Sequence, residues 1–161
     1  MNSSKRYKKS ELINFIYNIF LRKIFISSDH AGFTLKEKII NHFRKKELNF
    51  TDLGPYSKKR TDYPQFAHKL ANKVKKNKNN VGILICGSGT GMSMAANKHK
   101  KIRAAQCFSP KSTKLSRLHN DANVITLGSR LISKNNALKF ISIFLGTNFE
   151  GGRHLKRVKK I

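Results

Sequence analysis

The sequence predicts an α/β fold in which a mostly parallel β-sheet carries helices on both faces. From Lys23 onward, short apolar runs rich in β-branched residues alternate with stretches of helical periodicity. Five such runs occur, and no internal repeat is visible. Because consecutive parallel strands need a crossover between them, regular alternation of this kind is typical of such a sheet.

The strands are predicted from continuous apolar runs bounded by polar or turn-forming residues. The clearest is the run Val-Gly-Ile-Leu-Ile-Cys at residues 81–86, and Ile-Phe-Ile-Ser-Ser at residues 24–28 is typical of a buried strand. In chain order, the predicted strands are residues 24–28, 48–51, 81–86, 102–107 and 124–127. A turn is expected at residues 53–56, which contain Gly54 and Pro55.

The helices are predicted from apolar residues that recur every three or four positions. After the first strand, Leu35, Ile39 and Phe43 follow this spacing. Pro110 marks a helix start, because proline lacks the N–H group that a first helical turn leaves unpaired. The predicted helices are residues 35–43, 63–74, 88–97, 110–119 and 135–145. The basic segment 150–160 is expected to be helical or loosely ordered.

A chain of 161 residues suits a single domain with one packed core. We expect residues 23–161 to form this domain, with a helical segment at the C-terminus. Residues 1–22 are basic and contain a short apolar run, and we expect them to be an N-terminal extension outside the fold. A targeting or surface-seeking helix is the alternative for them. No run of about 20 apolar residues occurs, so no membrane span is predicted.

The chain is strongly basic, with 34 Lys and Arg residues against 8 Asp and Glu and a net charge of +26. Such a charge suits nucleic acid or an anionic membrane surface as a partner. However, the excess is mostly Lys spread along the chain beside Asn and Ile, which indicates a general bias in composition. No basic strand carries interleaved aromatic residues, so a nucleic-acid partner is not expected. A positive field would still attract anionic substrates.

Polar side chains gather where the predicted strands end. Asp29 and His30 follow the first strand, and Cys86 ends the third. His119 ends the helix after the fourth strand, and Arg130 follows the fifth. Each has a structural explanation when taken alone, since Asp29 can cap a helix and His119 can be a solvated helix end. Because the carboxyl ends of parallel strands meet at one edge of a sheet, together they indicate a ligand site.

The segment after Cys86 predicts an anion-binding loop. Its residues are Gly87, Ser88, Gly89, Thr90 and Gly91. Alternating glycines let backbone N–H groups point into a concave space, and the following helix start adds its positive dipole. Met92 stands where a dinucleotide fingerprint needs its third glycine, and no Gly-Lys-Ser/Thr follows as in a nucleotide P-loop. A tight turn without a ligand is the weaker alternative.

Cys86 is the candidate reactive group. The chain has two cysteines, too few for a disulfide framework, which predicts a reducing cytoplasm. A thiol at a helix N-terminus ionises readily to a thiolate that acts as base or nucleophile. Two chemistries stay open: acyl transfer by Cys86, His119 and Asp121, or proton abstraction next to a carbonyl, with the loop holding an enediolate.

The C-terminal tail carries a second cationic feature. Arg153 and Arg157 lie four residues apart after a Gly-Gly pair, on one face if this segment is helical. Such a pair, together with His30, can grip a phosphate group. The alternative is that both arginines belong to the general basic excess.

Six motifs occur in a specific order: DHAG at residues 29–32, RTDYP at 60–64, ICGSGTG at 85–91, AANK at 95–98, SRLHND at 116–121 and GGRH at 151–154. This series resembles the ribose-5-phosphate isomerase B family of the ribose/galactose isomerase superfamily. The resemblance covers residues 23–158 and does not include residues 1–22. It implies a Rossmann-like three-layer sandwich that forms a homodimer, or a tetramer, with each active site built from two subunits.

The resemblance also implies a role for each polar group. Cys86 is the base that moves a proton between C1 and C2, and His119 of the partner subunit opens the furanose ring. The loop 87–91 stabilises the enediolate, and the hydroxyl of Ser88, where the family often has Thr, can shuttle a proton between O1 and O2. The residues that match sugar-hydroxyl contacts are Asp29, Tyr63 and Asn120. Those that match phosphate contacts are His30, Arg130, Arg153 and Arg157.

The implied activity is the interconversion of ribose 5-phosphate and ribulose 5-phosphate in the pentose phosphate pathway, with no cofactor and no metal. Isomerases of allose or galactose 6-phosphate share the glycine loop and are the nearest alternative. His119 and the motif at 151–154 favour the pentose. A Cys–His hydrolase and a nucleic-acid-binding module are the alternatives from other classes.

Overall fold

The computed structural model describes residues 22–161, so the predicted extension lies outside the described residues except for Arg22. The elements are β1 (Ile24–Ser28), α2 (Phe33–Arg44), β2 (Phe50–Asp52), α3 (Tyr63–Val74), β3 (Val81–Cys86), α4 (Thr90–Ala96), β4 (Ala104–Gln106), α5 (Pro110–Asn120), β5 (Val124–Gly128), α6 (Lys134–Gly146) and α7 (Gly152–Val158). The five strands form one sheet in the order β2-β1-β3-β5-β4, and all four pairings are parallel. The predicted α/β class is confirmed.

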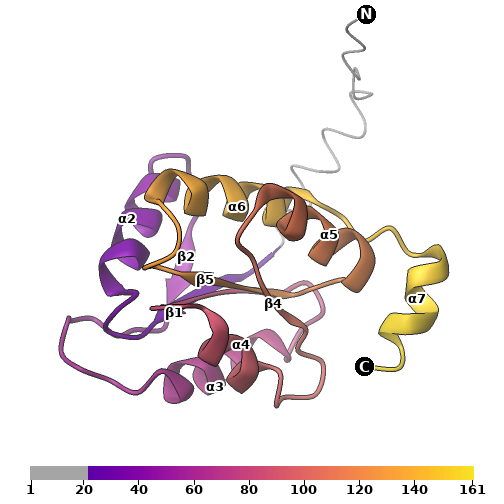
Figure 1. The fold of residues 1–161 in the computed structure, drawn as a ribbon, viewed down its shortest axis with the longest axis horizontal. Helices are drawn as coiled ribbons and strands as arrows, with labels where there is room; N and C mark the ends of the chain where they lie inside the picture. Colours follow the sequence, from indigo (N-terminus) through magenta and orange to yellow (C-terminus); the bar gives the residue numbers. More distant parts are fainter. Residues whose placement is uncertain (1–21) are drawn as a thin grey trace, which may run out of the picture.

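Helices cover both faces of the sheet (Figure 1). Helices α2, α5 and α6 form one layer, in which α2 contacts β1 and β3, α6 contacts β5, and α5 contacts α6. Helices α3 and α4 form the opposite layer against the central strands. Helix α7 lies at one end of the molecule and packs against α5 (Figure 1). None of the described helices combines the length and apolarity that crossing a bilayer requires.

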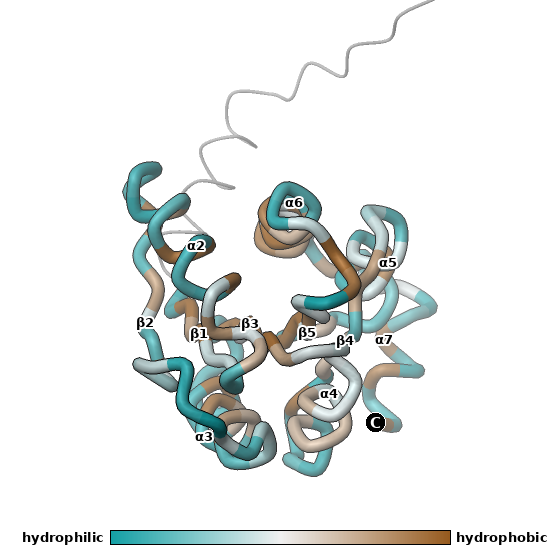
Figure 2. The backbone as a smooth tube through the Cα atoms, turned by 60° about the vertical axis from the view of Figure 1, so that its left-hand side comes forward, coloured by the Kyte–Doolittle hydropathy of each residue, from teal (hydrophilic) through white to brown (hydrophobic). Residues whose placement is uncertain are grey.

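Two hydrophobic clusters lie on opposite faces of the sheet, one under each helical layer. The central strands between the layers carry hydrophobic, brown segments in Figure 2. Ile83 of β3 points into the cluster that holds Phe140 and Phe144 of α6, whereas its neighbour Leu84 packs with Leu70 and Met92 on the other face. A strand covered on both faces is apolar at consecutive positions instead of alternating. This burial explains why β3 could be predicted so clearly from the sequence.

β1, β3 and α3 have the predicted bounds, and the other predicted strands and the helices before α7 differ by one or two residues at one or both ends. The differences in β2, β4 and α4 have identifiable causes. β2 begins at Phe50 instead of residue 48, because the N–H of Leu48 still donates to the carbonyl of Phe43 in the turn that ends α2. β4 is shorter than predicted, and the side chain of Asn97 occupies both the N–H and the carbonyl of Ala104 at its start. α4 begins at Thr90, since Gly89 is left-handed with φ 85°.

The parallel register brings three strand ends to one edge of the sheet. Ser28 at the end of β1 pairs with Ile85, and Cys86 at the end of β3 pairs with Gly128 at the end of β5. The N–H of Asp29 donates to the carbonyl of Ile85 at 3.1 Å, which fixes the segment after β1 against β3. The groups after these strands therefore share one location.

Gly32 allows the start of α2 to approach this edge closely. A Cβ atom at this position would lie 2.4 Å from the carbonyl oxygen of Ile85, and this backbone atom cannot move without disturbing β3. Any side chain at residue 32 must therefore push α2, and with it Asp29 and His30, away from the sheet.

The change Gly32→Ala is expected to lower the free energy of unfolding by about 1–3 kcal/mol, because it overpacks this contact. Equilibrium urea denaturation measures the change. Lys38→Ala, on the exposed face of the same helix, is the control and should stay within about 0.5 kcal/mol of the parent. Equal free energies of unfolding for the two variants would contradict the prediction, because they would show that the fold accommodates a side chain at residue 32 without loss of stability.

Candidate active site

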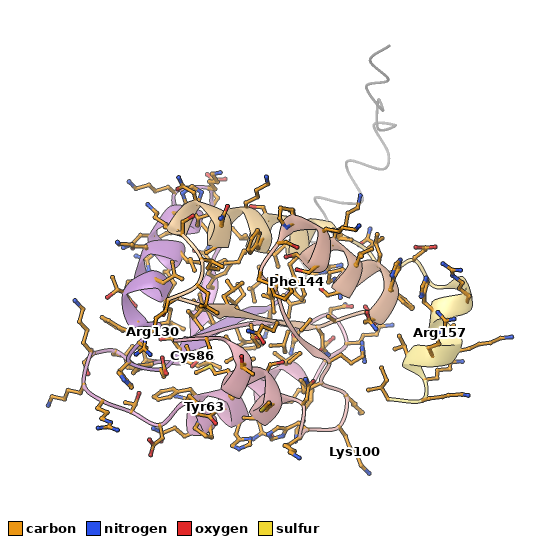
Figure 3. All side chains as sticks on the ribbon, in the orientation of Figure 1. Tyr63, Cys86, Lys100, Arg130, Phe144 and Arg157 are labelled. Atoms are coloured by element: carbon orange, nitrogen blue, oxygen red, sulfur yellow. The ribbon has the colours of Figure 1, made fainter. Side chains whose placement is uncertain are left out.

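A cavity of about 370 Å³ lies at the carboxyl edge of the sheet. Its lining residues are Asp29, His30, Ala31, Tyr63, Cys86, Gly87, Ser88, Gly91, Arg130 and Leu131. Figure 3 shows Tyr63, Cys86 and Arg130 on this side of the molecule. The volume lies in the range of small-molecule sites, and most of the predicted polar groups meet there.

Cys86 lies at the base of the glycine loop. Its Sγ accepts a hydrogen bond from the N–H of Gly89 at 3.1 Å. The loop curls back over the thiol because Gly89 takes a left-handed backbone conformation that suits glycine. A backbone donor at this distance stabilises negative charge on sulfur. The geometry therefore places the sulfur between a backbone donor and the cavity, within reach of a ligand.

The loop is braced from the edge strand by Gln106 of β4. Its Nε2 donates to the carbonyl of Ser88 at 2.8 Å, and its Oε1 accepts from the hydroxyl of Thr90 at 3.1 Å. The Oγ of Ser88 accepts from the N–H of Thr90 at 3.3 Å, which leaves its own proton free to donate. Sequence reasoning missed Gln106, although a polar residue near the end of a short apolar strand is a usable signal.

Tyr63 reaches the loop because Gly91 has no side chain. A Cβ atom on Gly91 would lie 2.6 Å from the Cζ atom of Tyr63. The phenol therefore lies directly against the start of α4, beside the cavity. The guanidinium of Arg130 approaches the loop in a similar way, since a Cβ on Gly87 would lie 3.3 Å from its Cζ atom.

Asp29 and His30 both line the cavity and are both held by the fold. Asp29 is buried, and its Oδ1 accepts from the N–H of Gly32 at 2.8 Å. This bond closes the turn before α2, whose N-cap is Gly32 and receives no side-chain cap, so Asp29 does not cap the helix itself. The Nδ1 atom of His30 lies 3.1 Å from the carbonyl oxygen of Thr61 and 3.3 Å from its backbone nitrogen. Thr61, which sequence reasoning did not identify as part of the site, thus orients the ring and leaves Nε2 available to a ligand.

Apart from Gly89 and Thr90 of the loop itself, four predicted site residues do not line this cavity in their own chain. They are His119, Asn120, Arg153 and Arg157. They belong to the end of α5 and to α7, and Figure 3 shows Arg157 at the opposite end of the molecule from Cys86. One chain therefore presents the predicted site residues as two separate groups.

The group at the end of α5 centres on two stacked imidazoles. The rings of His119 and His154 lie 4.2 Å apart, with an angle of 7° between their planes. The Nε2 of His119 is 3.8 Å from a carboxylate oxygen of Glu150. Burial, followed by the charges of His119 and Arg153, lowers the pKa of His154, so His154 is neutral at neutral pH. Neither His154 nor Glu150 was identified from the sequence as part of the site.

Among residues 22–161, these three side chains form the one group whose potential metal-ligand atoms lie close together. The ligand atoms of His119, Glu150 and His154 lie within 4.8 Å of one another. However, the in-plane lone pairs of two parallel imidazoles do not converge on one ion, and the Nε of Arg153 lies 3.4 Å from the Nε2 of His154. The arrangement as it stands does not suit a metal ion.

The hydrolase alternative finds no support within one chain. Its acid, Asp121, receives Arg103 on one carboxylate oxygen and Arg117 on the other, at 2.8 and 3.1 Å. His119 stacks on another imidazole and does not line the cavity that holds Cys86. The predicted Cys86–His119–Asp121 triad is therefore not assembled in a single chain.

Comparison with known proteins extends these observations. Residues 24–161 match the family described as Ribose/Galactose Isomerase. The chain is 50% identical over 140 residues to the probable ribose-5-phosphate isomerase B of Mycoplasma genitalium, covering 86% of this chain and 92% of that protein. It is 44% identical over 141 residues to ribose-5-phosphate isomerase B of Escherichia coli, covering 88% and 95%.

A solved structure gives the same relationship in three dimensions. The crystal structure of ribose-5-phosphate isomerase B from Mycoplasma genitalium with bound ribulose-5-phosphate superposes with a TM-score of 0.83 at 48% sequence identity. The superposition covers 87% of this chain and 93% of the other. The match therefore extends over nearly the whole described fold.

The two cysteines are expected to differ in reactivity under native conditions. Cys86 borders the cavity, whereas burial raises the pKa of Cys107 and keeps its thiol protonated at neutral pH. Brief treatment with iodoacetamide should therefore alkylate Cys86 first, as measured by peptide mass mapping. The Cys86→Ser variant should stay largely unmodified. Faster modification of Cys107 would contradict the assignment of Cys86 as the thiol that a small reagent reaches through the cavity.

Proposed function

Because the chain belongs to the ribose/galactose isomerase family, we propose that it interconverts D-ribose 5-phosphate and D-ribulose 5-phosphate through an enediolate, without a cofactor. Its enzyme class, an aldose–ketose isomerase of ribose 5-phosphate, rests on relatives at 44% and 50% identity over most of the chain. The single observation that carries the mechanism is the position of Cys86 under the glycine loop, in a cavity of substrate size.

Cys86 is the base in this mechanism. Its thiolate takes the proton from C2 of the open-chain aldose, the electron pair forms the enediolate double bond between C1 and C2, and the same proton or a solvent proton is returned to C1. The hydroxyl of Ser88 carries the second proton from O2 to O1. Backbone N–H groups of the loop stabilise the enediolate, at roughly 3 kcal/mol for each well-placed donor.

The remaining cavity residues bind the sugar. Asp29 and Tyr63 contact hydroxyl groups, and His30 and Arg130 lie towards the phosphate. The phosphate does not react, so its binding energy can be used to position C1 and C2 next to Cys86. The net charge of +26 attracts such an anion from a distance, and it does so without selecting a sugar.

His119, Asn120, Arg153 and Arg157 act in the cavity of the other chain of a homodimer. Their separation from Cys86 within one chain supports this arrangement. Exposed apolar side chains, such as Phe108 at 69% and Met94 at 65%, are available for a two-fold interface. His119 of the partner subunit opens the furanose ring as an acid–base group, a role for which histidine is suited near neutral pH.

The pentose is the substrate favoured over hexose 6-phosphates. The retained His119 and the Gly-Gly-Arg-His motif at residues 151–154 support this choice. The reaction then belongs to the pentose phosphate pathway in the cytoplasm.

The purified protein is expected to isomerise ribose 5-phosphate in preference to allose or galactose 6-phosphate. Cys86→Ala should lower kcat by about 10²–10⁴-fold, because it removes the proton-transfer group, while substrate still binds. A coupled assay for ribulose 5-phosphate measures turnover, and calorimetry measures binding. Turnover of a hexose phosphate alone, or near-normal activity of Cys86→Ala, would reject the proposal.

The shared site predicts complementation between two inactive chains. Cys86→Ala and His119→Ala are co-expressed with different tags, and the mixed dimer is purified over both tags. One of its two sites contains both intact residues, so it should recover about half of the parent activity per dimer. A mixed dimer of two differently tagged Cys86→Ala chains is the control and should stay inactive. No recovery in the first mixture would place Cys86 and His119 of one site in the same chain.

A further inference from the structure

Asp121 has a role that the reaction scheme leaves open. It directly follows His119 and Asn120, yet its carboxylate binds two arginines of its own chain. Oδ2 accepts from Nη2 of Arg103 at 2.8 Å, and Oδ1 accepts from Nη1 of Arg117 at 3.1 Å. Both guanidiniums are largely buried, with Arg117 at 7% and Arg103 at 22% side-chain exposure. On the guanidinium side the two ion pairs are thus largely shielded from the solvent that weakens surface pairs, whereas the Asp121 carboxylate is 34% exposed.

The same two arginines also hold the backbone at the end of α5. The Nε of Arg103 donates to the carbonyl oxygens of Asn120 and Asp121, at 3.0 and 2.9 Å. Nη1 of Arg117 donates to the carbonyl oxygen of Ala122. Three consecutive carbonyl groups directly after His119 are therefore bound by two guanidiniums that one carboxylate holds together.

The environment of Arg117 shows why the carboxylate matters. Burial lowers the pKa of this guanidinium, and the negative charge of Asp121 opposes that shift. The Nε of Arg117 also donates to the carbonyl oxygen of Thr147 at 3.1 Å, which ties the end of α5 to the segment after α6. A buried cation that binds both the end of α5 and the segment after α6 holds these two parts of the chain together.

Backbone conformation alone does not explain an aspartate at this position. Asp121 is left-handed, with φ 45° and ψ 42°, where it ends α5. Asparagine and glycine adopt this conformation at least as readily, so a helix end would be served equally well by either. The carboxylate is the property that they lack. It is therefore the charge of Asp121, beyond its backbone conformation, that the arrangement uses.

We propose that Asp121, held by Arg103 and Arg117, is a positioning residue that sets His119 and Asn120 for the cavity of the partner subunit. This inference rests on the proposed function, because it concerns the groups that complete that site. Asp121, His119 and Asn120 do not line the cavity of their own chain. A shift of about 1 Å in a reacting group can reduce turnover by roughly 10²-fold, so a small movement of the end of α5 is sufficient.

The test separates ring opening from proton transfer at C1. In D₂O, Cys86 exchanges a C1 proton of open-chain ribulose 5-phosphate for deuterium each time the enediolate returns, and this exchange does not need ring closure. Proton NMR measures the exchange and the formation of ribose 5-phosphate in the same sample. His119→Ala defines the signature of a lost ring-opening group: low turnover with exchange retained.

Asp121→Asn and Asp121→Gly both keep a residue that accepts the left-handed conformation, and both remove the charge. We expect each to lower turnover by about 10-fold to 10²-fold, with exchange within about threefold of the parent. The ratio of exchange to turnover should therefore rise as it does in His119→Ala. Arg103→Gln should give the same signature, and its effect should not add to that of Asp121→Asn, because both break one network.

Glu47 provides a matched control. It is also an acidic residue in a left-handed conformation, with φ 60°, and it forms no ion pair with another residue in the range 22–161. Glu47→Asn and Glu47→Gly should leave both rates unchanged. The Tm of every variant is measured, and all rates are taken below the lowest one.

The outcomes are distinguishable. An unchanged ratio in Asp121→Asn, Asp121→Gly and Arg103→Gln, beside an active parent, overturns the positioning role and leaves the proposed function intact. A parallel loss of exchange and turnover also overturns it, because the effect then acts on Cys86 or on the whole fold. A parent protein that catalyses neither exchange nor turnover overturns the proposed function and this inference with it.

Discussion

Parallel pairing of β3 with β1 on one side and β5 on the other determines where the functional groups of one chain can lie, because it brings three strand ends to one edge. Once the strands run in the same direction, each must be followed by a crossover, and the helices of these crossovers bury both faces of the sheet. The segments that leave the strand ends are the remaining places for polar groups. Cys86 is the last residue of the central strand, so its thiol is held by the most buried part of the fold.

The same constraint explains which parts of the fold were predictable. β3 and α3 have the predicted bounds, since continuous burial gives β3 an apolar residue or glycine at every position before Cys86 and since Pro64 and regular apolar spacing define α3. The edge strands β2 and β4 are short, only partly buried and limited by contacts with distant residues. Local periodicity carries no information about the Asn97 side chain that binds Ala104, so the start of β4 could not be read from the sequence.

The site shows a similar division. Cys86, the glycine loop and Asp29 were predictable because each follows a strand and carries its chemistry in its own residue type. Gln106 and Thr61 act through hydrogen bonds to residues 18 and 31 positions away in the chain. Such partners depend on how the crossovers pack, which spacing does not encode. Asp121 was recognised as an acid near a histidine, but its partners are arginines supplied by a strand entry and by its own helix.

Charge in this molecule acts on two scales. The excess of Lys produces a field that any anion would feel, and it needs no particular geometry. The few carboxylates, in contrast, mostly occupy defined positions: Asp52 pairs with the fully buried Lys36, Asp121 joins two buried arginines, and Glu150 lies beside His119. In a chain with so few acids, a carboxylate is the scarce partner, and the carboxylate of Asp121 holds two cations that would otherwise repel one another. The field of the whole chain does not discriminate between anions. At the end of α5, in contrast, the two ion pairs of Asp121 fix the backbone next to two groups that are proposed to complete the partner's site.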